Sequence, residues 1–236
     1  AVLNDTDELC RLINDRPITV DEWDYWKSVF RESELAAPLD LAFAFFYLNR
    51  TNRSGILNGG IIGGRNQTGK WKIDARYNKA DLITRISRIA NLRKRIRVTN
   101  LDAVEFMKSG AKTWSKRTLV YVDPPYYDKG KYLYHNSYRP DDHADISSVM
   151  NSISNIPWVV SYDDVRPIHD LYPTKSWLQY TLNYSARAKV RGREAMFFSA
   201  GLVVPKVPSP FEELYRGARA SNDGFVDVTA REFAEA

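Results

Sequence analysis

Apolar positions recur along this chain in two periods, one typical of helices and one typical of strands. In the helical stretches an apolar residue returns every three or four positions, as on the face formed by Leu82, Ile86 and Ala90. Short β-branched or aromatic runs indicate strands instead. Helices are predicted at 6–14, 20–30, 38–48, 82–90, 141–153 and 165–171, and around Val104 and Phe106. Strands are predicted at 1–5, 96–99, 118–122, 157–161, 178–184 and 194–199.

The order of these elements predicts the fold class. Strands that alternate with helices are typical of a mostly parallel sheet with helices on both faces. We therefore expect an α/β protein with a Rossmann-like, doubly wound, mostly parallel sheet, which ends in an antiparallel hairpin made by the last two strands. The chain from Val207 onward is polar and is expected to be weakly ordered. The loop of the hairpin holds four basic residues: Arg187, Lys189, Arg191 and Arg193.

The tetrapeptide Asp123-Pro124-Pro125-Tyr126 ends the run 118–122 and is the most informative motif. An acid at the carboxyl end of a buried parallel strand lies where open α/β sheets bind their ligands. The two prolines have a fixed φ and no N–H group, so the Pro124 carbonyl has a stiff direction. With the aromatic face of Tyr126, these groups predict a pocket for a planar molecule that carries an amino group. The alternative is an ordinary tight turn, because Asp-Pro and Pro-Pro are common turn signals.

Two further acids, Asp5 and Asp102, also follow predicted strands and precede predicted helices. Because the carboxyl ends of parallel strands share one edge of a sheet, these acids and Asp123 are expected to line one crevice. The alternative for Asp5 and Asp102 is helix capping, since aspartate is a favoured N-cap residue. Both roles can coexist in one residue.

The composition indicates a soluble protein with one sizeable domain, or a core domain with a substantial insertion. The chain has 236 residues, of which 44% are hydrophobic and 27% charged. No apolar stretch has the length of a membrane span, and no signal peptide is visible. Cys10 is the only cysteine, which excludes an intrachain disulfide and fits a reducing compartment. Three widely spaced histidines form no metal-binding motif and are expected at the surface or in loops: His135, His143 and His169.

The net charge of +5 is concentrated in one glycine-rich segment. Between Arg50 and Lys79 there are seven basic residues and one acid, a net +6. Six of the 12 glycines fall between Asn49 and Tyr77, which predicts turns and an extended, hairpin-containing insertion. Such a concentration of charge suits a polyanion, with strongly salt-dependent binding. The alternative is a solvated charged face.

Seven segments of the chain, taken in order, resemble the D12-class DNA adenine-N6 methyltransferases, the family of the Dam methylase. They are LND near the start, YLNRTNRSG, YNKADLITRI, VTNLDAVEF, YVDPPYY, VVSYDD and NYSARAKVRGREAMFFS, and they cover the chain up to about Pro205. The resemblance implies transfer of a methyl group from S-adenosylmethionine, without a metal, to N6 of an adenine flipped out of double-stranded DNA. An aspartate at the first motif position points to adenine, whereas serine there is more typical of cytosine-N4 enzymes.

The resemblance also implies roles for the motif residues. The lone pair of adenine N6 is delocalised into the ring, so the nitrogen is a poor nucleophile. The Asp123 carboxylate and the Pro124 carbonyl would accept its two hydrogens, which favours a pyramidal nitrogen whose lone pair can attack. Tyr126, which follows Pro125, would stack on the base.

The cofactor and DNA contacts are implied in the same way. Asp5, with its neighbour Thr6, matches the family acid that holds the ribose hydroxyls of the cofactor, and Asp102 matches the acid that contacts the adenine amino group. Family members place target recognition between the cofactor half and the Asp-Pro-Pro-Tyr motif, where the basic segment lies here. The candidate DNA contacts are Asn49, Arg50, Arg53, Arg65, Lys70, Lys72 and Arg76. Arg50 and Arg53 would contact phosphate or guanine, whereas Lys70, Lys72 and Arg76 would position the phosphates.

The resemblance predicts a domain organisation. The catalytic domain would comprise 1–48 and 92–205, the inserted target-recognition region 49–91 and a polar tail 206–236. The family's glycine-rich motif of the FxGxG kind, and the first strand with it, are absent before the strand at Val2, so we expect an N-terminally incomplete catalytic domain. The implied setting is a prokaryotic or phage cytoplasm, with a restriction enzyme as a candidate partner. The alternatives are a degenerate module that binds DNA without catalysis, and a methyltransferase for RNA adenine.

Overall fold

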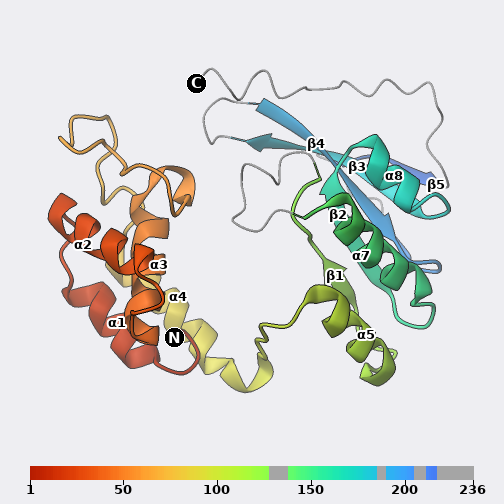
Figure 1. Ribbon diagram of the computed structural model, residues 1–236, viewed down its shortest axis with the longest axis horizontal. Coiled ribbons are helices and arrows are strands. Elements are labelled where there is room, and N and C mark those ends of the chain that lie inside the picture. Colours follow the sequence, from red (N-terminus) through yellow and green to blue (C-terminus); the bar gives the residue numbers. More distant parts are fainter. Residues whose placement is uncertain (128–137, 185–189, 205–210, 217–236) are drawn as a thin grey trace. The chain divides into compact units, whose positions relative to one another are not determined.

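The protein is described by a computed structural model, which defines residues 1–127, 138–184, 190–204 and 211–216. The chain divides into two compact units, Ala1–Thr99 and Asn100–Ala236. Each unit has its own hydrophobic core and is described by itself (Figure 1).

Four α-helices build the first unit. They are α1 (Thr6–Asp15), α2 (Val20–Arg31), α3 (Pro38–Thr51) and α4 (Lys79–Asn91), with short 3₁₀ turns η1 (Arg53–Gly55) and η2 (Arg93–Arg95). Thr19 caps α2 by accepting the backbone N–H of Glu22 at 3.2 Å, and Pro38 opens α3 where no N–H is needed. Trp26 and Phe43 meet in the core of this unit, edge to face. The four helices predicted in this part of the chain are confirmed.

Two amide side chains, of the buried Asn52 and the half-buried Gln67, fix the turns between α3 and α4. Asn52 accepts a hydrogen bond from Trp23 Nε1 at 2.6 Å and donates to the carbonyls of Ile56 and Leu57 at 2.8 and 2.9 Å. Gln67 likewise donates to two carbonyls of its own turn. Three apolar residues of the segment lie in the same core as α1, α2 and α3: Ile61, Ile73 and Tyr77. The basic segment is therefore folded onto the helices that precede it.

The second unit contains a five-stranded sheet in the order β1-β2-β4-β3-β5. The strands are β1 (Val120–Val122), β2 (Trp158–Asp163), β3 (Ser176–Tyr184), β4 (Val190–Phe198) and β5 (Phe211–Arg216). The helices are α5 (Ala103–Thr113), α7 (Pro140–Ser152) and α8 (Arg166–Leu171). Strands β1 and β2 are parallel, whereas the pairs β2–β4, β3–β4 and β3–β5 are antiparallel.

The two faces of this sheet differ in chemistry. Since side chains alternate along a strand, Val160 and Tyr162 of β2 share a face with their register partners Phe197 and Ala195 of β4. This face packs against the apolar sides of α5, α7 and α8 and forms the core of the unit (Figure 1). The residues between them on β2 and β4, such as Ser161, lie on the opposite face, which is partly polar.

The mixed α/β class is confirmed, but the described sheet is mostly antiparallel, in contrast to the mostly parallel sheet expected. The reason lies in the connections. Strands β1 and β2, which are parallel neighbours, are joined through a segment that contains α7. Strands β3 and β4 form a direct hairpin, and a hairpin makes an antiparallel pair. The hairpin itself was expected, although β4 begins at Val190 and takes in Arg191 and Arg193, which were expected in its loop.

Two predicted strands are wrong. Residues 1–5 form a turn, closed by hydrogen bonds from the N–H groups of Asn4 and Asp5 to the Ala1 carbonyl at 3.2 and 2.8 Å. Residues 96–99 form no strand, and Val98 is 77% exposed. Both runs are short and belong to a unit that is built from helices, so neither finds a strand to pair with inside its own unit.

Three smaller expectations also need correction. The 49–77 segment was expected to be an extended, hairpin-containing insertion. Instead α3 continues to Thr51, and the segment contains only one isolated bridge, between Asn52 and Ile61. His143 and His169 are buried in α7 and α8 rather than exposed. Strand β5 forms within the predicted weakly ordered tail. His135, the basic residues Arg187 and Lys189, and the rest of the tail lie outside the described residues.

Candidate functional site

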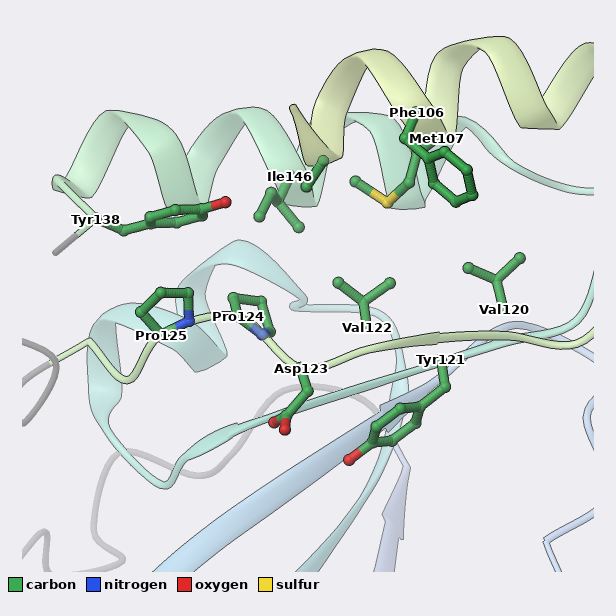
Figure 2. A pocket seen from close by; sticks show the side chains of 11 residues that line it. Phe106, Met107, Val120, Tyr121, Val122, Asp123, Pro124, Pro125, Tyr138 and Ile146 are labelled. Atoms are coloured by element: carbon green, nitrogen blue, oxygen red, sulfur yellow. The ribbon is translucent and has the colours of Figure 1, made fainter. Parts of the chain in front are cut away.

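Asp123 stands directly after the carboxyl end of β1, where the sequence predicts it. Its side chain is exposed, whereas the following Pro124 is buried. Figure 2 shows the Asp123 carboxylate and the Tyr121 ring on one side of β1, and Val120 and Val122 on the other. This alternation places the carboxylate on the partly polar face of the sheet, away from the helices.

A chain of hydroxyl groups holds this carboxylate. Ser161 of β2 donates to Asp123 Oδ1 at 2.6 Å. Because the single hydroxyl hydrogen of Ser161 is used in this way, the Tyr121 hydroxyl, 2.8 Å from Ser161 Oγ, is the donor in that contact. The Asp123 Oδ2 atom accepts no hydrogen bond from the described residues. One oxygen is thus anchored, and the other is left as an acceptor on an exposed side chain.

The two tyrosines after the prolines are tied to the sheet by side-chain carboxylates. The Tyr126 hydroxyl donates to Glu194 Oε1 of β4 at 2.5 Å. The Tyr127 backbone N–H donates to Asp163 Oδ1 of β2 at 2.8 Å. The motif is therefore a turn fixed on both sides of its prolines.

An apolar pocket of about 250 Å³ lies between β1 and the helices of the same unit (Figure 2). Phe106 and Met107 of α5 form one part of its wall and Ile146 of α7 another. The remaining lining comes from Ala103, from Tyr138 and from β1 with the turn that follows it: Val120, Tyr121, Val122, Asp123, Pro124 and Pro125. Flat aromatic and proline surfaces with few polar atoms suit a planar ring system.

Asp102 caps the helix that lines this pocket. Its Oδ1 atom accepts the backbone N–H groups of Val104 and Glu105 at 2.9 and 3.2 Å. Neither hydrogen bond uses Oδ2, so the capping role leaves one carboxylate oxygen for a ligand. The next residue, Ala103, lines the pocket, so Asp102 lies at the end of the helix that forms part of the pocket wall. Burial first, and then the charge of Asp102, raises the pKa of Tyr138.

Asp5 and Thr6 lie in the first unit, at the start of α1. Asp5 occupies the N-cap position but its side chain makes no capping hydrogen bond, and its carboxylate is 4.0 Å from the terminal amine of Ala1. Thr6 Oγ1 donates to the Val2 carbonyl at 2.8 Å. Asp5 and Asp102 do not follow strands, and of the three expected strand-end acids only Asp123 does. The ribose-binding role of Asp5 and Thr6 stays a prediction.

The basic segment gathers cationic side chains around the end of α3. Burial first, and then the nearby charges of Arg76 and Arg85, lowers the pKa of Arg50. Asn49 orients Arg50 by accepting from its Nε and Nη2 atoms at 3.1 and 2.5 Å. Guanidinium groups held close enough to repel one another form a surface that an anion stabilises.

The other basic candidates differ in the contacts that their side chains already make. Arg65 forms a bidentate pair with Asp24 at 2.8 and 2.7 Å, so its guanidinium already has an anionic partner. Lys72 Nζ donates to the Gln67 carbonyl at 2.6 Å. Lys70 lies 5.8 Å from the ring centroid of Trp71, which is 66% exposed. Arg53 is exposed.

Sequence reasoning missed four residues that the structure brings to these sites. Ser161 and Glu194 lie on strands far along the chain from the motif they hold, and only the strand register reveals them. Trp71 and Arg85 had a signal in the sequence. Trp71 is flanked by two lysines, and Arg85 lies on the polar face of α4.

The fold and the motif are those of a mixed α/β protein with a fixed acidic turn beside an apolar pocket that suits a planar ring. The chain belongs to the D12 class N6 adenine-specific DNA methyltransferase family, whose sequence model matches residues 12–186. The match includes the Asp123 to Tyr126 motif and the basic segment, and it excludes Asp5, Thr6 and Glu194. A search of curated proteins found no match.

Two further properties of the described residues bear on the site. None of the described helices has the length and hydropathy needed to cross a membrane. Within the same residues, no group of three or more histidine, cysteine, aspartate or glutamate side chains is arranged to hold a metal ion.

Proposed function

We propose that this protein transfers a methyl group from S-adenosylmethionine to N6 of an adenine in double-stranded DNA. The observation that carries the proposal is the Asp123 carboxylate, which is exposed at the end of β1 and has one oxygen anchored by Ser161. An acceptor fixed before the substrate arrives needs no reorganisation during the reaction. Membership of the adenine-N6 family supplies the substrate class.

The proposed mechanism uses the acceptors of the motif. One N6 hydrogen of a flipped adenine is accepted by Asp123 and the other by the Pro124 carbonyl, while the ring stacks on Tyr126. The nitrogen becomes pyramidal, its lone pair forms the bond to the methyl carbon as the carbon–sulfur bond breaks, and the surplus N6 proton passes by way of Asp123 to water. The hydrogen bond from the Tyr126 hydroxyl to Glu194 supports the stacking role of Tyr126, because it holds the aromatic ring in a set orientation.

The residues around the apolar pocket fit the adenosine part of S-adenosylmethionine, which supplies an electrophilic methyl group when bound. The pocket, at about 250 Å³, is lined by flat apolar groups and is closer to the size of a nucleoside than of a whole drug-like ligand. Asp102 Oδ2 is the acceptor that would bind an adenine amino group, while Oδ1 keeps the helix cap. Phe106 and Tyr138 would hold the ring from the sides and exclude water.

The proposed DNA contact is the basic surface of the first unit, formed by Arg50, Arg53, Lys70, Lys72 and Arg76. The mutual repulsion of Arg50 and Arg76 supports an anionic partner. Under this proposal, 49–91 acts in target recognition, while 1–48 and 92–205 contribute to a catalytic domain with the doubly wound architecture of the family.

The proposal is tested by incubating the protein with labelled S-adenosylmethionine and mixed-sequence duplex DNA, then analysing the nucleosides. The same assay is run on the chain joined to a segment that carries the family's glycine-rich motif. Label in N6-methyladenine supports the proposal, and label in N4-methylcytosine contradicts it. DNA binding without transfer by either protein would favour a binding module, and transfer to RNA alone would favour an RNA methyltransferase.

A further inference from the structure

Two carboxylates on neighbouring strands hold the turn that follows Pro125. Asp163 of β2 and Glu194 of β4 are directly opposite each other in the antiparallel register, and each is only 4% exposed. Asp163 binds the backbone of Tyr127, while Glu194 binds the phenol of Tyr126. Two buried acids placed side by side repel each other and cost free energy to desolvate, so their presence needs the compensation that these hydrogen bonds give.

Glu194 is itself held from a second side. Its Oε2 atom accepts a short hydrogen bond from the hydroxyl of Tyr180 on β3. Burial first, and then this hydrogen bond, raises the pKa of Tyr180, so the phenol remains a donor at neutral pH. A carboxylate fixed through one oxygen presents the other in a defined direction, and that oxygen is the acceptor for Tyr126.

We propose that Glu194 is a positioning residue, which fixes the plane of the Tyr126 ring so that it is ready to receive the target base. The inference rests on the proposed function, since it assigns a role within that reaction. The two prolines fix the backbone up to Tyr126, but the ring could still rotate about its side-chain bonds. The hydrogen bond to Glu194 removes this freedom before the base arrives, so less ordering is needed in each reaction cycle.

The first test is a double-mutant cycle on the rate of methyl transfer to unmethylated genomic DNA. Tyr126→Phe keeps the stacking ring and removes the hydroxyl that binds Glu194. Glu194→Gln removes the negative charge of the acceptor in that hydrogen bond. We expect each change to lower kcat about tenfold with little change in KM for DNA, because a hydrogen bond to a charged group is lost. The double variant is expected to be no slower than the slower single variant, because both changes remove the charge-assisted form of the same hydrogen bond.

The matched control is Tyr162→Phe, which removes a buried hydroxyl from the opposite face of the same sheet. This hydroxyl lies 3.2 Å from His143 Nδ1, and it takes no part in the hydrogen bonds that join Glu194 to Tyr126 and Tyr180. The thermal stability of Tyr162→Phe should fall about as much as that of Tyr126→Phe, while its kcat stays close to that of the unsubstituted protein. Additive losses in the cycle, or an equal loss of kcat in Tyr162→Phe, would overturn the positioning role.

A second readout separates this inference from the proposed function. Protein labelled with ¹³C at the ζ carbon of tyrosine reports the hydrogen bond of each phenol without DNA or cofactor. Glu194→Gln is expected to shift the Tyr126 and Tyr180 signals, and Tyr162→Phe is expected to leave both in place. An unshifted Tyr126 signal would overturn the hydrogen bond between Tyr126 and Glu194, even if methyl transfer is observed. A shifted signal in a protein that transfers no methyl group would refute the proposed reaction but not this hydrogen bond.

Discussion

Ser161 donates a 2.6 Å hydrogen bond to Asp123 from the neighbouring parallel strand, and it receives one from Tyr121 on the strand that Asp123 ends. This contact crosses the only parallel pair in the described sheet, one residue beyond the last paired position, Val122 with Val160. It explains how an exposed acid on a turn acquires a fixed direction.

Ser161→Ala is expected to lower kcat for methyl transfer about tenfold, because the change removes one hydrogen bond to a charged acceptor. Initial rates at saturating DNA and S-adenosylmethionine will measure the loss. A variant with full kcat would show that Ser161 does not position Asp123 for the reaction.

Asp102→Ser separates the two roles of Asp102. Serine is a good N-cap residue, so the free energy of unfolding should stay near that of the unsubstituted protein, while Asp102→Ala loses about 1 kcal/mol. Serine is too short to reach a ligand, so affinity for S-adenosylmethionine should fall in both variants. Calorimetry of binding and urea unfolding measure the two effects. Normal affinity in Asp102→Ser would restrict this residue to capping.

Lys70→Ala combined with Lys72→Ala should weaken DNA binding and flatten its salt dependence. Removal of two phosphate contacts reduces the slope of log K against log salt by about 2. Binding is measured by fluorescence anisotropy at several salt concentrations. The control pair is Lys108→Ala with Lys112→Ala on α5, where both lysines are exposed. An unchanged slope in the first pair would exclude these lysines from the DNA interface.

Gly110→Ala is expected to destabilise the second unit although alanine is the better helix former. A Cβ atom at Gly110 would lie 1.9 Å from the Trp114 ring, so the tryptophan must move out of its place against the core. Overpacking costs about 1–3 kcal/mol and alanine returns about 1 kcal/mol, so the expected net loss is up to about 2 kcal/mol. Urea unfolding will measure it. Gly60→Ala is the control, because nothing lies within 4 Å of its added Cβ.

The sequence predicted the helices better than the sheet. Helix α2 follows from Thr19 and the period of its tryptophans, both of which are local signals. The sheet depends on which strands meet, and the antiparallel register of β4 beside β2 has no local signature. For the same reason Asp123 was found from its motif, while Ser161 and Glu194 became visible only once the strands were paired.

In the proposed mechanism, Asp123 holds the amino group that receives the methyl. The direct test compares Asp123→Ala with the unsubstituted sequence, in the form that is active in the nucleoside assay, for labelled N6-methyladenine and for DNA affinity. We predict that transfer falls by at least about a hundredfold, because a preorganised acceptor is lost, while DNA affinity changes little. Unchanged transfer by Asp123→Ala would contradict the account.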